Sequence, residues 1–194
     1  IPAHVLNTQN TFISCIEKFL ERLEVPAYKI ASFEIIDLPL IECIASTGKP
    51  VILSTGLATY DEIGEAIEVA RSAGCEELAL LHCISGYPTP PEEANLAVME
   101  KLEKKFKVVV GLSDHTLGTV VAVSAISCGA NIIEKHVALR RADGGPDAGF
   151  SLEPEEFSEM TKSCLTAWKA IGKPHITRTQ SEIKNLIFLS LLLT

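Results

Sequence analysis

Two histidines stand where two apolar segments of the sequence end. The motif GLSDHTLG carries His115, and IIEKHVAL carries His136, 136 − 115 = 21 residues further on. Side chains alternate between the two faces of a strand, so Ser113 shares a face with His115, and Glu134 shares one with His136. Imidazole binds Mn, Fe, Zn and similar ions, with oxygen atoms or water in the other positions. The pattern fits either a shared metal site with an incomplete ligand set or two hydrogen-bonded histidines at strand ends.

Charged side chains accompany the histidines. Glu34 and Glu134 would act as acid or base groups in a buried site, or each would pair with Lys29 or Lys135. Lys29 would hold a substrate carboxylate or phosphate, or form a Schiff base as in lysine aldolases. Asp147 lies in a Gly-Pro loop that is either a simple turn or a substrate contact at the mouth of a barrel.

These residues need elements that bring them together, and the sequence repeats a strand-then-helix pattern. Strands are expected at 27–32, 49–55, 77–85, 107–114 and 131–138, and helices at 11–24, 37–47, 59–74, 91–106, 117–130 and 153–172. The strand segments are near-continuous Val, Ile and Leu runs, which is typical of parallel strands covered on both faces. Their spacing of roughly 22–30 residues fits βα units.

Two α/β folds fit this pattern, a doubly wound sheet and a (β/α)₈ TIM barrel. Neither a G-x-G-x-x-G nor a P-loop motif occurs, which weakens the case for a nucleotide-binding sheet. Polar residues gather at the C-terminal ends of all five predicted strands, as in barrel enzymes; they are Ser32, Glu34, Ser54, Thr55, His82, Ser85, Tyr87, Ser113, His115, Glu134 and His136. We therefore predict an incomplete TIM barrel that contains about the last five of eight βα units, with His82 in a structural role.

Composition argues against several classes of function. The net charge of −8 argues against nucleic acid or an anionic membrane as a partner. No apolar stretch approaches the about 18–20 residues of a membrane span, and no signal peptide is evident. The six cysteines are scattered without a C-x-x-C motif, as expected of small buried side chains in a reducing cytosol. We therefore predict a cytoplasmic protein.

Six motifs in the same order resemble the sialic acid synthase family: YKIASFE, PVILSTGLAT, YPTP, GLSDHTLG, IIEKH and GGPDAGFSLEPEEF. The resemblance runs from about Val25 to about Asn185. Members of this family condense phosphoenolpyruvate with an amino sugar on a (β/α)₈ barrel, which is followed by a small antifreeze-like domain, usually in a swapped dimer. The resemblance thus implies a preceding barrel helix (1–24), the C-terminal part of the barrel (25–175) and a truncated linker toward a missing domain (176–194).

The resemblance also implies roles for individual residues. His115 and His136 would bind a divalent ion, Mn²⁺ or Mg²⁺, which polarises the sugar aldehyde. Glu34, Glu134 and Lys29 would position or deprotonate groups near the reacting carbons. The implied substrate-binding residues are Lys29, Ser54 and Ser113 for phosphoenolpyruvate, Tyr87 and Asp147 for the sugar, and in addition Ser32 and Ser85.

Two details point to a sugar. The loop GGPDAGFSLEP, and Ser85 two residues before the Tyr-Pro, resemble the pseudaminic acid branch of the family, whose substrate is a 2,4-diacetamido-2,4,6-trideoxy hexose. The sialate and legionaminate branches tend to carry EGPDHKASLEP and an Asn instead, and both remain alternatives. A Schiff-base aldolase and an inactive barrel fragment also remain open.

The chain departs from the family pattern at both ends. The family's first three strands, with a glutamate and a phosphate-binding lysine, have no counterpart, and LIFLSLLLT follows Asn185 where Arg-Arg-Ser-Leu is usual. We therefore expect this chain alone to lack synthase activity, and the full-length enzyme to be a homodimer.

Overall fold

Five parallel strands form a single sheet in the computed structural model, which describes residues 24–186 of the chain. The strands are β1 (Tyr28–Ile30), β2 (Val51–Ser54), β3 (Leu78–Cys83), β4 (Val109–Asp114) and β5 (Ile133–Lys135). They are ordered in the sheet as they are in the chain. A doubly wound sheet reverses its strand order at a switch point, whereas here each βα unit follows the previous one in the same direction. The predicted incomplete α/β barrel is confirmed as a half-barrel.

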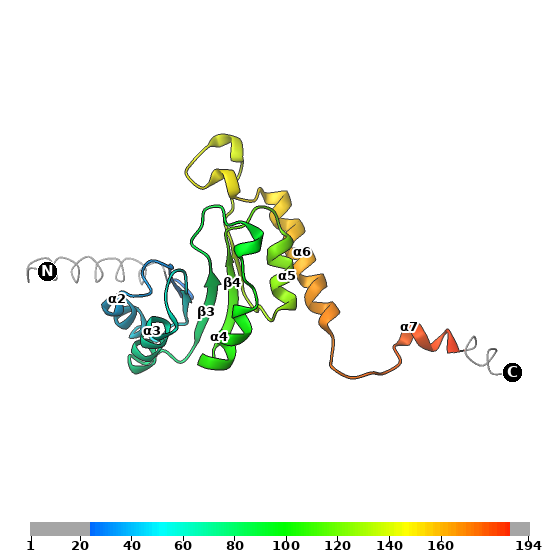
Figure 1. Cartoon of the computed structure of the whole chain (residues 1–194), viewed down its shortest axis with the longest axis horizontal. Coiled ribbons are helices and arrows are strands. Elements are labelled where there is room, and N and C mark those ends of the chain that lie inside the picture. The colour runs from blue at the N-terminus through cyan, green and yellow to red at the C-terminus, as the bar shows by residue number, and fades with distance from the viewer. Residues whose placement is uncertain (1–23, 187–194) are drawn as a thin grey trace, which may run out of the picture.

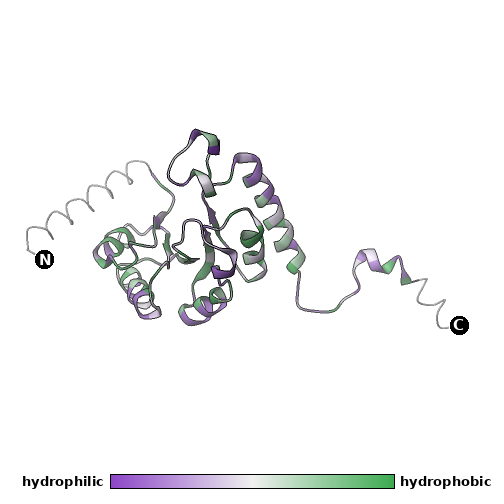
Figure 2. Ribbon diagram, turned by 45° about the horizontal axis from the view of Figure 1, so that its top comes forward, coloured by the Kyte–Doolittle hydropathy of each residue, from purple (hydrophilic) through white to green (hydrophobic). Residues whose placement is uncertain are grey.

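Helices follow the strands in sequence. They are α2 (Leu38–Ala45), α3 (Tyr60–Ser72), α4 (Val98–Phe106), α5 (Val120–Ser127) and α6 (Pro154–Ile171). α2 and α3 lie together at one end of the sheet, α5 and α6 lie together at the other, and α4 lies between the two pairs (Figure 1). Figure 2 shows hydrophilic and hydrophobic residues alternating along α3 and α6, as expected of helices with one face on a core.

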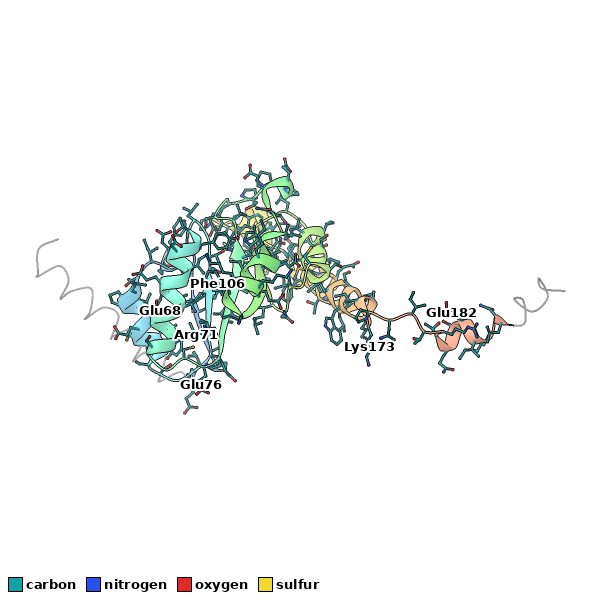
Figure 3. The ribbon with its side chains drawn as sticks, turned by 60° about the horizontal axis from the view of Figure 1, so that its bottom comes forward. Glu68, Arg71, Glu76, Phe106, Lys173 and Glu182 are labelled. Atoms are coloured by element: carbon teal, nitrogen blue, oxygen red, sulfur yellow. The ribbon has the colours of Figure 1, made fainter. Side chains whose placement is uncertain are left out.

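Two helices begin at the residues that the sequence predicts. Asp37 caps α2, and its side chain accepts a hydrogen bond from the Leu40 backbone N–H at 3.2 Å. Thr59 and Glu62 form a reciprocal capping box at the start of α3. Each cap satisfies N–H groups that the first helical turn leaves unpaired. At the other ends of α3 and α4, the Arg71 side chain donates a hydrogen bond to the Phe106 carbonyl at 3.2 Å (Figure 3).

The helix predicted over 91–106 is wrong in its first half. The segment contains a short 3₁₀ turn (Pro91–Glu93) and then α4, which begins only at Val98. Between them Asn95 has a φ of 43°, a left-handed conformation that an α-helix excludes and that asparagine tolerates. The Ala94 carbonyl is bonded to His82 Nε2 at 2.8 Å, so β3 takes the acceptor that a continuous helix would use.

The main core lies between the sheet and its helices. Leu53, Leu80 and Leu112 from three adjacent strands belong to one buried cluster with Ile67 of α3 and Leu102 of α4. Burying side chains of this size contributes about 1.5–3 kcal/mol each. Alternate strand residues thus face the helices, and the residues between them face the interior of the half-barrel.

Gly111 permits a close approach on the interior face. A Cβ atom at this position would lie 2.3 Å from the Ile132 carbonyl oxygen and 2.7 Å from a Leu81 methyl carbon. Any side chain would therefore push β4 away from the segment that leads into β5.

Beyond α6 the chain extends away from the sheet toward the short helix α7 (Gln180–Ile183), which the sequence did not predict (Figure 1). Figure 3 labels Lys173 and Glu182 along this extension. The helix expected at 11–24 falls, apart from Glu24, outside the described residues, and the division at 24 and 175 stays a prediction. Across residues 24–186, none of the helices has the length and apolar character needed to cross a membrane.

Candidate active site at the strand ends

One cavity of about 370 Å³ lies at the C-terminal ends of the strands. Its lining residues come from all five strands and the loops that follow them: Lys29, Ala31, Ser32, Ser54, Cys83, Tyr87, Ser113, His115, Glu134, His136 and Asp147. The fold thus collects nine of the eleven residues that the sequence and the resemblance single out. Ser85 lies beside the cavity and donates a hydrogen bond to Ser32 Oγ at 3.1 Å.

Glu34 is the predicted site residue that the fold does not bring to this cavity. It is exposed, and it lines a separate hollow at the outer edge of β1. Its backbone N–H donates to the Ala31 carbonyl at 3.2 Å, so the chain turns directly after β1 and the strand alternation stops there. Its predicted catalytic role has no support in this geometry.

His115 and His136 lie side by side in the cavity, at the ends of two adjacent strands. β4 pairs with β5 at a constant offset, with Ser113 opposite Glu134, and the same offset sets His115 opposite His136 one position beyond the last paired residues. The ring centroids are 5.3 Å apart and the ring planes meet at 62°. The backbone carbonyls of both residues are held as well, by Thr89 N–H at 3.0 Å for His115 and by Leu152 N–H at 2.9 Å for His136.

The hydrogen bonds of His115 select one form of its ring. Nδ1 lies 2.9 Å from the Ile84 carbonyl, which can only accept, so Nδ1 carries the proton and Nε2 keeps a free lone pair. Cys83 Sγ is 3.8 Å from the same Nδ1. Burial lowers the pKa of His115, but the bonds with Cys83 and Ile84 outweigh it and leave this pKa raised. Conversely, burial raises the pKa of Cys83, and the bond with His115 leaves it lowered.

Asp147 lies beside the second histidine. Its Oδ2 is 3.6 Å from His136 Nδ1, and both side chains are partly exposed to the cavity. At this separation the two groups are close but form no hydrogen bond, so the contact selects neither ring nitrogen of His136 as the ligand atom. The hydrogen bond of His115 Nδ1 therefore leaves Nε2 of that ring available, and the His136 ring lies beside it.

Glu134 is held by two partners. Its Oε1 accepts a hydrogen bond from Ser113 Oγ at 2.7 Å, and its Oε2 is 3.6 Å from Lys29 Nζ. Lys29 also donates to the Ile30 carbonyl at 3.1 Å. The carboxylate is thus held between a hydroxyl and an ammonium group at the edge of the cavity.

Ser54 carries a buried hydroxyl group that has no hydrogen-bond partner within residues 24–186. The residue is 2% exposed. Leaving such a group unsatisfied costs about 1–3 kcal/mol. Because Ser54 lines the cavity, an oxygen of a bound ligand is the natural partner for this hydroxyl.

Two aromatic rings pack against the histidines; Tyr87 lines the cavity, whereas Phe150 is buried. Tyr87 packs on His115 with ring centroids 4.3 Å apart, and Phe150 packs on His136 at 4.9 Å. Tyr87 and Phe150 are 5.8 Å apart. Burial is the main cause of a raised pKa of Tyr87, so its phenol stays a neutral donor at neutral pH.

Sequence reasoning missed two lining residues, Ala31 and Cys83. Cys83 was expected to be a small buried side chain, and at 1% exposure it is, yet it borders the cavity beside His115. Strand alternation was the available signal, because Cys83 follows His82, whose side chain turns the other way to Ala94. His175 lies beyond α6 and is exposed, and His4 lies outside the described residues.

The sequence matches the NeuB family over residues 11–176. The chain belongs to the NeuB family. This NeuB chain is 44% identical over 162 residues to the pseudaminic acid synthase of Helicobacter pylori, a match that covers 84% of this chain and 48% of that protein. It is 40% identical over 169 residues to the N,N'-diacetyllegionaminic acid synthase of Campylobacter jejuni, covering 86% and 51%. The chain therefore spans about half the length of the curated relatives that it matches.

A solved structure agrees with this family membership. The N-acetylneuraminic acid synthetase of Leptospira borgpetersenii, in complex with citrate, superimposes on this NeuB chain with a TM-score of 0.81 at 33% identity. The superposition covers 88% of this chain and 60% of the other.

Proposed function

We propose that this chain forms the site-bearing half-barrel of a NeuB synthase that condenses phosphoenolpyruvate with a 2,4-diacetamido-2,4,6-trideoxy hexose to give pseudaminic acid. The observation that supports it is one cavity that holds the adjacent histidines, the carboxylate of Glu134 and the Ser54 hydroxyl, which has no partner within residues 24–186. In the proposed reaction, carbon 3 of phosphoenolpyruvate attacks the aldehyde carbon of the open-chain sugar. Water adds at carbon 2, and inorganic phosphate leaves as its C–O bond breaks.

Lys29 and Ser54 are the groups best suited to hold phosphoenolpyruvate. Lys29 brings a positive charge to the cavity, and Ser54 brings a donor with no partner among the described residues. The Ser113 hydroxyl already donates to Glu134, so its part is to orient that carboxylate. Glu134 in turn is placed to take up or deliver a proton beside the reacting carbons.

The two histidines fit a divalent ion such as Mn²⁺ or Mg²⁺. The Nδ1 of His115 is bonded to the Ile84 carbonyl, which leaves its Nε2 as one nitrogen ligand, and the adjacent His136 ring would supply the second. Within residues 24–186 there is no group of three or more His, Cys, Asp or Glu side chains suited to a metal, so water and substrate oxygens would fill the other positions. Such an ion supplies Lewis-acid polarisation of the sugar aldehyde.

An aromatic surface beside the histidines favours a deoxy sugar. Tyr87 lines the cavity and its partly exposed ring packs on His115, so the sugar would meet an aromatic face there. A methyl group at carbon 6 suits this surface better than a hydroxyl group, which would be left without a partner. Legionaminate and N-acetylneuraminate precursors remain the alternatives in the same site.

A chimera tests this proposal. Residues 25–175 of this chain would replace the matching segment of the Helicobacter pylori relative, and phosphate release from phosphoenolpyruvate would be followed with each of the three sugar precursors. We expect turnover with the pseudaminic acid precursor and none when both histidines are changed to Ala. A folded chimera that is inactive with all three sugars contradicts the proposal, and turnover of another precursor alone would reassign the substrate.

A Schiff-base aldolase is the competing enzyme class. Lys135 turns away from the cavity to Asp114, so Lys29 is the lysine on which this alternative depends among the described residues. Borohydride reduction in the presence of pyruvate would trap a covalent adduct on Lys29 of an aldolase, and we expect no adduct. We also expect no phosphate release by the 194-residue chain alone, because catalytic residues of barrel enzymes come from several strands and five are described here.

A further inference from the structure

A buried ion pair lies on the opposite face of the strands from the cavity. Asp114 and Lys135 are direct partners in the pairing of β4 with β5, and they are the last residues of their strands. Asp114 Oδ2 and Lys135 Nζ are 2.8 Å apart, and each side chain is 1% exposed. Neither residue lines the cavity, so the proposed reaction makes no direct use of them.

The pair closes around the segment that carries the first histidine. Asp114 Oδ1 accepts a hydrogen bond from the Thr116 backbone N–H at 2.9 Å. Lys135 Nζ, besides its contact with Asp114, donates to the Thr116 carbonyl. His115 is thus the middle residue of a three-residue turn whose two flanks are both bound to the side chain of Lys135, the residue directly before His136.

The Asp114–Lys135 pair links β4 to β5 at the point where backbone pairing between these strands ends. The ladder between β4 and β5 ends at Asp114 and Lys135, so the two histidines lie one residue beyond the last paired position. Two charges with 1% exposure are costly to desolvate, and apolar residues of similar size would stabilise the sheet at least as well. What apolar residues cannot supply is a set of directional bonds from one side chain to both flanks of His115.

We propose that the Asp114–Lys135 pair is a positioning device that sets the separation and orientation of the His115 and His136 rings. The proposal rests on the proposed function only for its consequence, the affinity of the site for a divalent ion. The competing explanation is that the pair merely stabilises the sheet.

The test uses the 194-residue chain and a variant that removes both charges together, Asp114→Leu/Lys135→Met. Single neutral substitutions leave one buried charge unpaired and are expected to unfold the chain, so they cannot separate positioning from stability. A second variant, Lys135→Arg, keeps the charge pair but replaces a compact ammonium by a broad planar group. The control is Glu100→Gln/Lys104→Met, which removes an exposed ion pair on α4.

Three measurements are made on each variant. Thermal unfolding reports whether the variant folds cooperatively, and the nuclear Overhauser effect between the two histidine rings, in isotope-labelled chain without metal, reports their separation. Mn²⁺ binding is measured from the paramagnetic resonance signal of the free ion. We expect both variants to unfold cooperatively, to lose or weaken the ring-to-ring signal, and to bind Mn²⁺ about 10- to 100-fold more weakly. The control should match the unchanged chain in all three.

Either folded variant with an unchanged ring-to-ring signal overturns the proposal. If the apolar double variant showed no cooperative unfolding transition, the ring-to-ring signal of Lys135→Arg alone would decide whether the proposal holds. Failure of the unchanged chain to bind Mn²⁺ would contradict the metal role in the proposed function, while the ring-to-ring signal would still decide whether the pair positions the histidines.

Discussion

Lys29 Nζ and Glu134 Oε2 lie 3.6 Å apart, although Lys29 is on β1 and Glu134 is on β5, the two outer strands of the sheet. Neighbouring strands are about 4.8 Å apart, so the outer strands of a flat five-stranded sheet would be separated by roughly 19 Å. Two side chains cannot span that distance, so the sheet must curve strongly toward the cavity. The pair is partly exposed and stabilises the fold little; its significance is that it brings both ends of the half-barrel to one site.

The metal role predicts a specific loss at His136. His136→Ala removes one of two nitrogen ligands, so the chain should bind Mn²⁺ more weakly. In the chimera the loss in kcat should be at least about a hundredfold, because a Lewis acid supplies several kcal/mol and each ~1.4 kcal/mol is about tenfold in rate. High Mn²⁺ should restore part of the rate, and the affinity for phosphoenolpyruvate should change less.

His175→Ala is the matched control for this prediction, since His175 is exposed and lies outside the cavity. It should leave kcat and Mn²⁺ binding unchanged. Near-normal kcat of His136→Ala in chelator-treated buffer would show that the strand-end histidines only position other groups.

Ser54 predicts opposite effects on stability and on binding. Its hydroxyl lacks a partner within residues 24–186, so Ser54→Ala removes an unsatisfied buried group and should leave the free energy of unfolding unchanged or raise it by up to about 1 kcal/mol. The same substitution should weaken phosphoenolpyruvate binding, which calorimetry would measure on the chimera. Thr161→Ala, on the exposed side of α6, is a control that should leave binding unchanged. Unweakened binding by Ser54→Ala would remove Ser54 from the substrate site.

His82 predicts a pH dependence of stability. Burial, the largest influence, lowers its pKa below the ordinary value of 6.5, although the bond to the Ala94 carbonyl opposes this shift. The unfolded chain therefore takes up a proton at a higher pH than the folded chain. The contribution of neutral His82 to the free energy of unfolding should be fully present above about pH 6.5. It should decrease as the pH drops below this value toward the pKa of the folded state.

His82→Gln separates this effect from the other histidines. A glutamine amide can donate to the Ala94 carbonyl and does not titrate, so the variant should lose less stability than the unchanged chain between pH 7.5 and pH 5.5. Urea unfolding at the two pH values measures the difference. Equal losses in both proteins would show that His82 does not contribute.

The sequence predicted the five strands and their order because the strands are apolar runs, and it predicted where α2 and α3 begin because the caps Asp37 and Thr59 act locally. The pair of histidines was predictable for the same reason, since alternation along β4 and β5 needs no knowledge of distant contacts. Alternation failed at Glu34, where the chain turns after Ile30, and the helix expected from Pro91 failed at Asn95. Both failures come from backbone turns whose conformations depend on tertiary contacts.

The partners of each side chain were less accessible to sequence reasoning. The sequence left both Lys29 and Lys135 as possible partners of Glu134, and only the curvature of the sheet selects Lys29. The position of Lys135 on the other face followed from alternation, whereas its bonds to Asp114 and Thr116 depend on where the ladder ends. Spacing along a strand predicts the face on which a residue lies; the distance to a partner is set by the sheet as a whole.

Glu134 predicts a loss of rate without a loss of fold. Glu134→Gln keeps an oxygen that accepts from Ser113 Oγ, now 2.7 Å away, and removes the charge that faces Lys29. Because the Lys29 pair is partly exposed, the free energy of unfolding should change by no more than about 1 kcal/mol. If the carboxylate takes up or delivers a proton during condensation, kcat of the chimera should fall by about 10²- to 10⁴-fold. Glu103→Gln, at an exposed position of α4, is the control and should leave kcat unchanged. A Glu134→Gln chimera with unchanged kcat and only weaker phosphoenolpyruvate binding would reduce Glu134 to a group that orients Lys29.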